Sequence, residues 1–164
     1  MDRTIKVVIA DDHSLLRTGL VQLLGMTEEI EVVGQAANGS EAMDLAAKLR
    51  PDVILMDINM PGLNGIEATR QISAKYCVPI LALTIHDDEE YIAEMIRAGA
   101  KGYILKDSDL KNLVQAIKRV AEGDSFFPSN LMEKVAVKFH ELKQQRYGIN
   151  HYATMNDSGA QSLT

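Results

Sequence analysis

Five side chains that could do chemistry stand at the ends of short apolar segments of this chain. The segments cover residues 5–10, 53–57, 78–84 and 102–105, and their composition is typical of buried strands. The polar residues that end or follow them are Asp11, Asp12, Asp57, Thr84 and Lys106. Ligands bind outside the carboxyl ends of the strands in an open parallel sheet, so we expect these side chains to converge on one rim.

Three carboxylates on one rim predict a bound cation. Crowded carboxylates repel one another, and they stay ionised readily only when a cation lies among them. Mg²⁺, or the similar Mn²⁺, fits this role because it takes oxygen ligands and is typically held by one or two carboxylates plus a phosphate. We expect Asp11, Asp12 and Asp57 to hold the ion, and the backbone carbonyl of Asn59 is placed to add a ligand.

Asp57 is the candidate nucleophile of the rim, because a carboxylate can accept a phosphoryl group and form an aspartyl phosphate. Thr84 could then donate to a phosphoryl oxygen, and Lys106 could pair with the phosphoryl charge. Taken singly, these residues are more simply a turn residue, a strand-end hydroxyl and a solvated lysine. Their combination at the ends of several strands is what favours phosphoryl chemistry. His13 and His86 are expected to be loop residues without a metal-ligand role.

The elements that must position these residues alternate between strands and helices. A fifth strand-like segment lies at 31–35, and segments with helical periodicity separate the five strands. The clearest helical stripe consists of Leu110, Leu113, Val114, Ile117, Val120 and Ala121. This alternation predicts an α/β domain in which a parallel sheet carries helices on both faces.

Composition favours one globular domain without membrane spans or disulfides. The chain has 164 residues, of which 46% are hydrophobic and 24% charged, a formal net charge of -6 and one cysteine. No run approaches the roughly 18 apolar residues of a transmembrane helix, and an acidic domain is unsuited to binding a nucleic-acid backbone. We therefore expect a cytoplasmic protein that binds no membrane.

The compact domain is expected to span residues 1–128, since 123–128 is the last strong break in the apolar pattern. Residues 129–147 predict an amphipathic linker helix. The polar remainder, up to residue 164, predicts a flexible tail.

Four sequence runs resemble the receiver domain of two-component response regulators, in particular the NarL/LuxR-type (FixJ-like) branch. They are VVIADDH (7–13), DVILMDINMPGLNGIE (52–67), ILALTIHDDEEY (80–91) and AGAKGYILKD (98–107). The resemblance covers about residues 3–128 and is specific in combination. It implies a flavodoxin-like (βα)5 doubly wound parallel sheet with strand order 2-1-3-4-5.

The resemblance also implies roles for individual residues. It assigns the phospho-acceptor to Asp57, the acidic pair that organises Mg²⁺ to Asp11 and Asp12, the carbonyl ligand to Asn59, the switch hydroxyl to Thr84, the phosphate-pairing lysine to Lys106 and the rotating aromatic to Tyr103. Beside the site, Asn59, Ile85 and His86 are placed to tune the dephosphorylation rate.

Partners follow from the same resemblance. A sensor histidine kinase would supply the phosphoryl group, and phosphorylation would promote a homodimer and control a DNA-binding output domain, hence transcription. The ending Ser162, Leu163, Thr164 resembles the opening of a helix-turn-helix domain, so we expect a receiver and linker from which that domain is absent. DNA would be bound only through the missing domain. Such a receiver assists its own phosphorylation and dephosphorylation but is not a turnover enzyme.

Three alternatives stay open at the level of sequence. The first is a stand-alone receiver that acts as an interaction module without DNA-binding output. An aspartyl-phosphate phosphohydrolase of the haloacid-dehalogenase type would need a second carboxylate two residues after the nucleophile, where this chain has Asn59. A flavodoxin-like electron carrier would need a glycine- and hydroxyl-rich phosphate loop after the first strand, where this chain has Asp11, Asp12 and His13.

Overall fold

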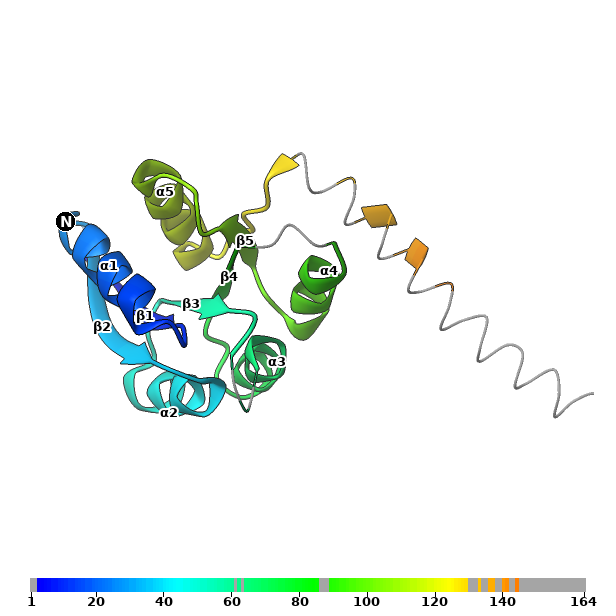
Figure 1. The fold of residues 1–164 in the computed structure, drawn as a ribbon, viewed down its shortest axis with the longest axis horizontal. Coiled ribbons are helices and arrows are strands. Elements are labelled where there is room, and N and C mark those ends of the chain that lie inside the picture. Colours follow the sequence, from blue (N-terminus) through cyan, green and yellow to red (C-terminus); the bar gives the residue numbers. More distant parts are fainter. Residues whose placement is uncertain are drawn as a thin grey trace, which may run out of the picture.

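A computed structural model describes residues 3–60, 62, 64–85 and 89–129, together with 133, 136, 137, 140, 141 and 144. It contains one parallel sheet with the strand order β2-β1-β3-β4-β5, which confirms the flavodoxin-like prediction (Figure 1). The strands are β1 (Ile5–Ala10), β2 (Ile30–Ala36), β3 (Val53–Asp57), β4 (Ile80–Thr84) and β5 (Gly102–Leu105). The helices are α1 (Ser14–Gly25), α2 (Gly39–Leu49), α3 (Gly65–Lys75), α4 (Glu89–Ala98) and α5 (Leu110–Ala121).

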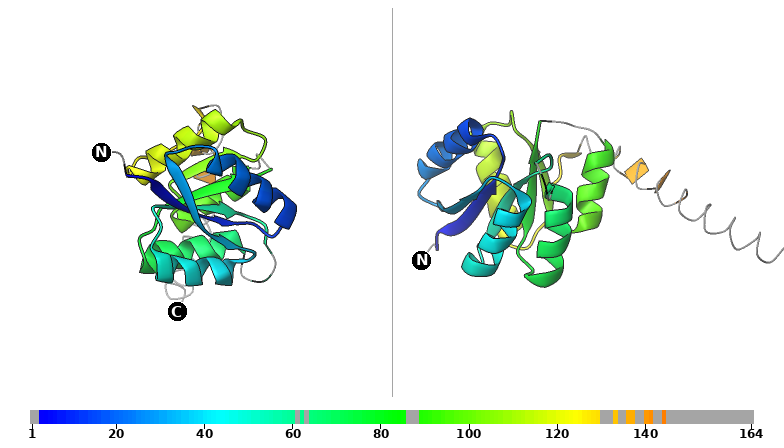
Figure 2. Two further views of the ribbon diagram at one scale, coloured as in Figure 1. Left: turned by 90° about the vertical axis from the view of Figure 1, so that its left-hand side faces the viewer. Right: turned by 60° about the horizontal axis from the view of Figure 1, so that its bottom comes forward.

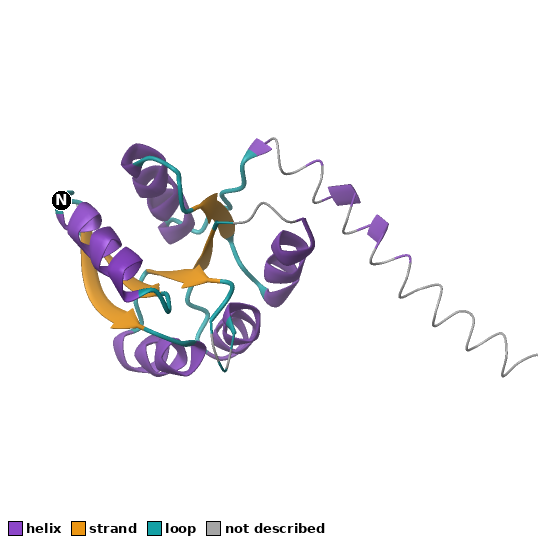
Figure 3. Cartoon of the chain, viewed as in Figure 1, coloured by secondary structure: helices purple, strands orange, loops and turns teal. Residues whose placement is uncertain are grey.

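Helices and strands alternate along the chain, and helices lie on both sides of the sheet (Figures 2 and 3). The fourth strand begins at Ile80 rather than at residue 78 as the apolar run suggested. Pro79 has no N–H group to donate to the ladder, and its carbonyl oxygen accepts the N–H of Ile54 just before β4 starts. The second strand is one residue longer at each end than the sequence predicted.

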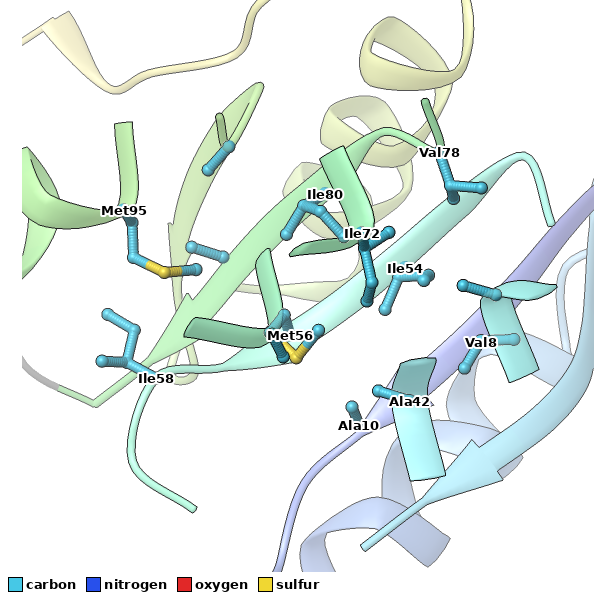
Figure 4. Close-up of a cluster of buried hydrophobic side chains, with 14 of the residues drawn as sticks. Val8, Ala10, Ala42, Ile54, Met56, Ile58, Ile72, Val78, Ile80 and Met95 are labelled. Atoms are coloured by element: carbon cyan, nitrogen blue, oxygen red, sulfur yellow. The ribbon is translucent and has the colours of Figure 1, made fainter. Parts of the chain in front are cut away.

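The alternation of side chains along the central strands divides the core into two halves. Figure 4 shows the half covered by α2, α3 and α4, where Val8, Ile54 and Ile80 meet side chains such as Ile72 of α3 and Met95 of α4. The other half lies between the sheet and helices α1 and α5; its members include Val7, Ile9, Leu55, Leu81, Leu20, Leu24, Leu113 and Ile117. Because β3 and β4 are buried on both faces, their carboxyl ends are held rigidly.

Three helices have an N-terminal side-chain cap. The side chains of Asn38, Asn64 and Asp109 each accept the backbone N–H of the residue three positions later, at 2.8–2.9 Å. Among these caps, Asn64 matters most for the site, because it caps the N-terminus of α3 only a few residues after Asp57 at the end of β3. The loop that follows Asp57 is thereby closed within a few residues.

After α5 the chain returns to the edge of the sheet. The carbonyl oxygen of Phe126 accepts the N–H of Tyr103 at 2.9 Å, and the N–H of Phe126 donates to Lys101 at 3.0 Å. Gly102 lies between them, bridged to Phe126. The outer edge of β5 is thus partly covered.

Beyond Pro128, the described residues of the expected linker helix 129–147 are helical. The rest of that helix and the expected tail lie outside the described residues. Among the described helices, none combines the length and apolar character needed to cross a membrane.

Candidate functional site

Two carboxylates and one ammonium group meet at the carboxyl edge of the sheet. Lys106 Nζ is 2.9 Å from Asp11 Oδ2 and 3.4 Å from Asp57 Oδ2. All three side chains are nearly buried, with 0%, 6% and 7% of the side chains of Asp11, Asp57 and Lys106 exposed. In such a place each charge needs a partner, and Lys106 offsets part of the charge of the two carboxylates.

The strand register explains why residues so far apart in sequence meet here. Asp57 of β3 pairs with Leu83 of β4, so Thr84 extends one residue further along the same edge. Thr84 in turn pairs with Leu105 of β5, and its carbonyl oxygen accepts the N–H of Lys106 at 2.7 Å. The three neighbouring strand ends therefore present Asp57, Thr84 and Lys106 side by side.

The two acidic residues after β1 are not equivalent. Asp11 is fully buried, and its Oδ1 accepts the backbone N–H of His13 at 2.8 Å while its Oδ2 faces Lys106. The side chain of Asp12 is 31% exposed and opens to solvent. Asp12 is thus the more accessible ligand, and Asp11 holds the loop and the lysine in place.

The acidic pocket could hold a metal ion. One ligand atom from each of Asp11, Asp12, His13 and Asp57 lies within 4.8 Å of the others. The donor set is rich in carboxylate oxygen, which suits a hard divalent cation such as Mg²⁺. Lys106 offsets only part of the negative charge of the three carboxylates, so a cation would be electrostatically favoured there.

Arg17 supports this pocket in a way that sequence reasoning missed. Its guanidinium group donates to the backbone carbonyl of Asp11 and, at 3.2 Å, to the side chain of Gln35 on β2. The arginine thereby ties the loop after β1 to both α1 and β2 without engaging a carboxylate of the pocket. The available signal was its position one helical turn after His13, whose carbonyl accepts the Arg17 N–H.

Burial raises the pKa of Asp57 from 3.8 to about 6. The ion pair with Lys106 lowers this pKa, the charge of Asp11 raises it, and hydrogen bonds from Lys106 and from the backbone of Asn59 lower it. The carboxylate is therefore mostly ionised at neutral pH but less stable than an exposed one. A group in this state gains from binding a cation or an electrophile.

The raised pKa predicts a pH-dependent stability in the absence of divalent cations. Asp57 binds its proton more tightly in the folded chain than in the unfolded chain, so its contribution to stability is fully present below pH 3.8 and is lost as the pH rises through about 6. The shift corresponds to about 3 kcal/mol. We expect urea unfolding to show that Asp57→Asn gains stability relative to wild type by about that amount between pH 3.5 and 7.5. A difference between the two proteins that does not vary with pH would contradict the raised pKa.

Thr84 and Tyr103 are both 1% exposed. Tyr103 belongs to the half of the core that also contains Ile92 and Met95 of α4. Its strand neighbour Ala82 lies two residues before Thr84. The predicted switch residues therefore lie on adjacent strands, close to the helix that follows β4.

Two exposed residues lie just beyond the strand ends that carry Asp57 and Thr84, and we call them the mouth of the site. Asn59 lies two residues beyond Asp57 and is exposed, and Ile85 next to Thr84 is 69% exposed. His86, the third residue expected to tune dephosphorylation, lies outside the described residues.

Comparisons with known proteins agree on one family. Residues 7–118 match the response regulator receiver domain. The chain is 42% identical over 142 residues to the transcriptional regulatory protein DegU of Brevibacillus brevis, covering 86% of this chain and 60% of the relative. It is also 42% identical to the oxygen regulatory protein NreC of Staphylococcus epidermidis, covering 85% of this chain and 65% of the relative.

A solved structure shares the architecture. The two-component response regulator of the LuxR family from Aurantimonas sp. SI85-9A1 superposes with a TM-score of 0.76 at 34% identity, covering 83% of this chain and 98% of the other. The chain spans about three fifths of the length of DegU, so the match concerns one part of such a regulator.

Proposed function

This chain belongs to the response regulator receiver domain family, and from that premise we propose that its Asp57 accepts a phosphoryl group from a sensor histidine kinase in a Mg²⁺-dependent reaction. The observation that carries the proposal is the buried cluster in which Lys106 lies between Asp11 and Asp57. A carboxylate that is buried, ionised and incompletely neutralised is suited to attack an electrophilic phosphorus atom.

In the proposed reaction, an oxygen of Asp57 forms a bond to phosphorus as the bond from phosphorus to the donor nitrogen breaks. Displacements of this kind pass through a loose, in-line transition state, and catalysis consists mainly of positioning and charge stabilisation. Lys106 already lies 3.4 Å from Asp57 and would pair with the incoming phosphoryl oxygens. Asp57 accepts the group without releasing a proton, because it is ionised beforehand.

The cation would be held by Asp12 and Asp57, with Asp11 in support and the backbone carbonyl of Asn59 as a further ligand. When bound, Mg²⁺ would neutralise charge that develops on the phosphoryl oxygens. The chain's own contribution is a loop held by Arg17 and by the hydrogen bond from His13 to Asp11, which keeps both acidic residues at the sheet edge.

Phosphorylation would act as a switch through Thr84 and Tyr103. The added group carries a charge of about -1.5 to -2 and strong acceptor oxygens, so it favours the conformation in which the Thr84 hydroxyl donates to it. A shift of the population from 1:99 to 99:1 needs about 5.5 kcal/mol, within reach of a few charge-assisted hydrogen bonds. The surface that would change is that of α4, β5 and α5.

In the whole protein, we propose that this change promotes a homodimer and controls a DNA-binding output domain. The support is that DegU, the relative described above, is a transcriptional regulatory protein of greater length. In this role the chain is a signalling protein of the cytoplasm that assists its own phosphorylation, and it is not a turnover enzyme. DNA would be contacted through the output domain, because this part of the chain is acidic.

The experiment that tests the proposal is intact mass spectrometry after incubation with acetyl phosphate. We expect the wild-type chain to gain one phosphoryl group with Mg²⁺ present and none after chelation. Beryllofluoride, which mimics the phosphoryl group without being hydrolysed, should bind under the same conditions. Failure of both phosphoryl transfer and beryllofluoride binding in a folded chain would overturn the proposal.

The exposed mouth predicts opposite effects of two substitutions on dephosphorylation. Ile85→Ala should admit water beside Thr84 and speed loss of the phosphoryl group severalfold, whereas Asn59→Leu should exclude water and slow it. Both positions are exposed, so unfolding free energies should stay within about 0.5 kcal/mol of wild type. Leu49→Ala, at an exposed apolar position of α2, is the matched control. Equal half-lives of the phosphorylated state in all four proteins, wild type included, would contradict this role of the mouth.

A further inference from the structure

His13 lies against the acidic pocket, although its sequence context favoured a loop residue without a metal-ligand role. Its Nδ1 atom is 3.1 Å from Oδ1 of Asp12 and 3.5 Å from Oδ1 of Asp11. Together with Asp57, these residues form the cluster whose ligand atoms lie within 4.8 Å of one another. The pocket is therefore not made of oxygen donors alone.

The distances between these ligand atoms suit a shared coordination shell around one ion. Neighbouring ligands of an octahedral ion with bonds of about 2.1 Å are about 3.0 Å apart, and opposite ligands are about 4.2 Å apart. The distance from His13 to Asp12 is that of neighbouring ligands, and the whole cluster needs only a slight contraction around an ion.

The backbone of His13 is anchored while its ring is exposed. Its N–H donates to Asp11 Oδ1 at 2.8 Å, and its carbonyl accepts the N–H of Arg17 at 2.9 Å. The side chain makes no capping hydrogen bond to α1 and is 72% exposed. The ring can therefore turn toward an ion without disturbing the helix.

We infer that His13 is a nitrogen ligand of this cation site. It shifts the metal selectivity of the site toward borderline transition-metal ions such as Zn²⁺ and Co²⁺. Imidazole suits these ions, whereas Mg²⁺ takes oxygen ligands. Asp12, Asp57 and His13 would supply three protein ligands and leave the remaining positions of the octahedral shell open. The inference rests on the proposed function, because the same carboxylates would hold Mg²⁺.

The test compares Zn²⁺ and Mg²⁺ binding by calorimetry at one fixed pH in the wild type, His13→Ala and His140→Ala. We expect His13→Ala to bind Zn²⁺ at least about tenfold more weakly, because the loss of even an outer-shell partner costs about 10- to 100-fold in affinity. Its Mg²⁺ affinity should change by less than about threefold, since the oxygen ligands remain. His140, whose ring contacts Gln144, is the matched control and should affect neither ion.

Imidazole nitrogen shifts in the NMR spectrum give a readout that does not depend on affinity. Added Zn²⁺ should shift the Nδ1 resonance of His13 in wild type, and Asp12→Asn should abolish that shift. Zn²⁺ affinity of His13→Ala within about twofold of wild type, or an equal loss in His140→Ala, would overturn the inference. If either of these results is found while the wild type is phosphorylated with Mg²⁺, only the role of His13 as a ligand is refuted. If the wild type shows no Mg²⁺-dependent phosphorylation, the proposed function is refuted instead.

Discussion

Replacing Asp57 with asparagine is expected to abolish the phosphoryl group that the wild-type chain gains from acetyl phosphate. The amide is almost the same shape as the carboxylate, but it is a poor nucleophile and removes one negative charge from the cation pocket. Lys106 would remain beside Asp11, so the surrounding pocket is preserved. Intact mass spectrometry of both proteins under identical conditions measures the effect directly.

The control for this substitution is Asp44→Asn. Asp44 is an exposed carboxylate on α2 and does not belong to the acidic pocket, so its loss should leave phosphorylation unchanged. Beryllofluoride should bind the Asp44 variant and fail to bind the Asp57 variant. A phosphoryl gain in Asp57→Asn equal to that of the wild type would place the acceptor on another residue.

Replacing Gly65 with alanine is expected to cause the second large effect. An added Cβ would lie 2.0 Å from the backbone oxygen of Asp57 and 2.9 Å from the Cα of Ile58. Both obstacles are backbone atoms, so the start of α3 and the end of β3 must separate. We expect a loss of about 3 kcal/mol in the free energy of unfolding, at the upper end of the usual range for overpacking.

The same substitution should slow phosphorylation about a hundredfold, because a displacement of about 1 Å at reacting atoms has effects of that size. The N–H of Gly65 donates to Ile58 at 3.0 Å, so the glycine closes the loop that carries Asn59. Urea unfolding and the rate of phosphoryl gain are the two measurements, with the rate taken at low temperature where the variant is folded.

Gly19→Ala makes the same chemical change in a helix with open space around it. Nothing lies within 4 Å of a Cβ at Gly19, so alanine should stabilise α1 by about 0.5–1 kcal/mol and leave phosphorylation intact. An unfolding free energy of Gly65→Ala within about 0.5 kcal/mol of wild type would show that the loop yields easily, against this prediction.

The sequence by itself determined the order of elements and which residues reach the carboxyl edge. Apolar runs such as 53–57 predict buried strands, and the side chain that ends each run is carried to the edge by the parallel ladder. The positions of Asp57, Thr84 and Lys106 on this edge follow from that pattern together with the strand order. The apolar run predicts the start of the fourth strand two residues before Ile80, because such a run does not reveal where Pro79 interrupts the ladder.

Only the tertiary structure decided which of these residues are buried and which partner each of them contacts. Asp11 and Asp12 are adjacent and chemically identical, yet one is buried against Lys106 and the other opens to solvent. Arg17 and Gly65 matter through contacts with Asp11 and Asp57. The position of Arg17 one helical turn after His13 is a sequence signal for the first contact, whereas the second has no signature in residue type or spacing. Local periodicity specifies a face and an end of an element, whereas burial and the distances between side chains on different elements depend on how those elements pack. It is this packing that buries Asp57 and so raises its pKa, and that brings Asp57 to the cluster formed by Asp11, Asp12 and His13.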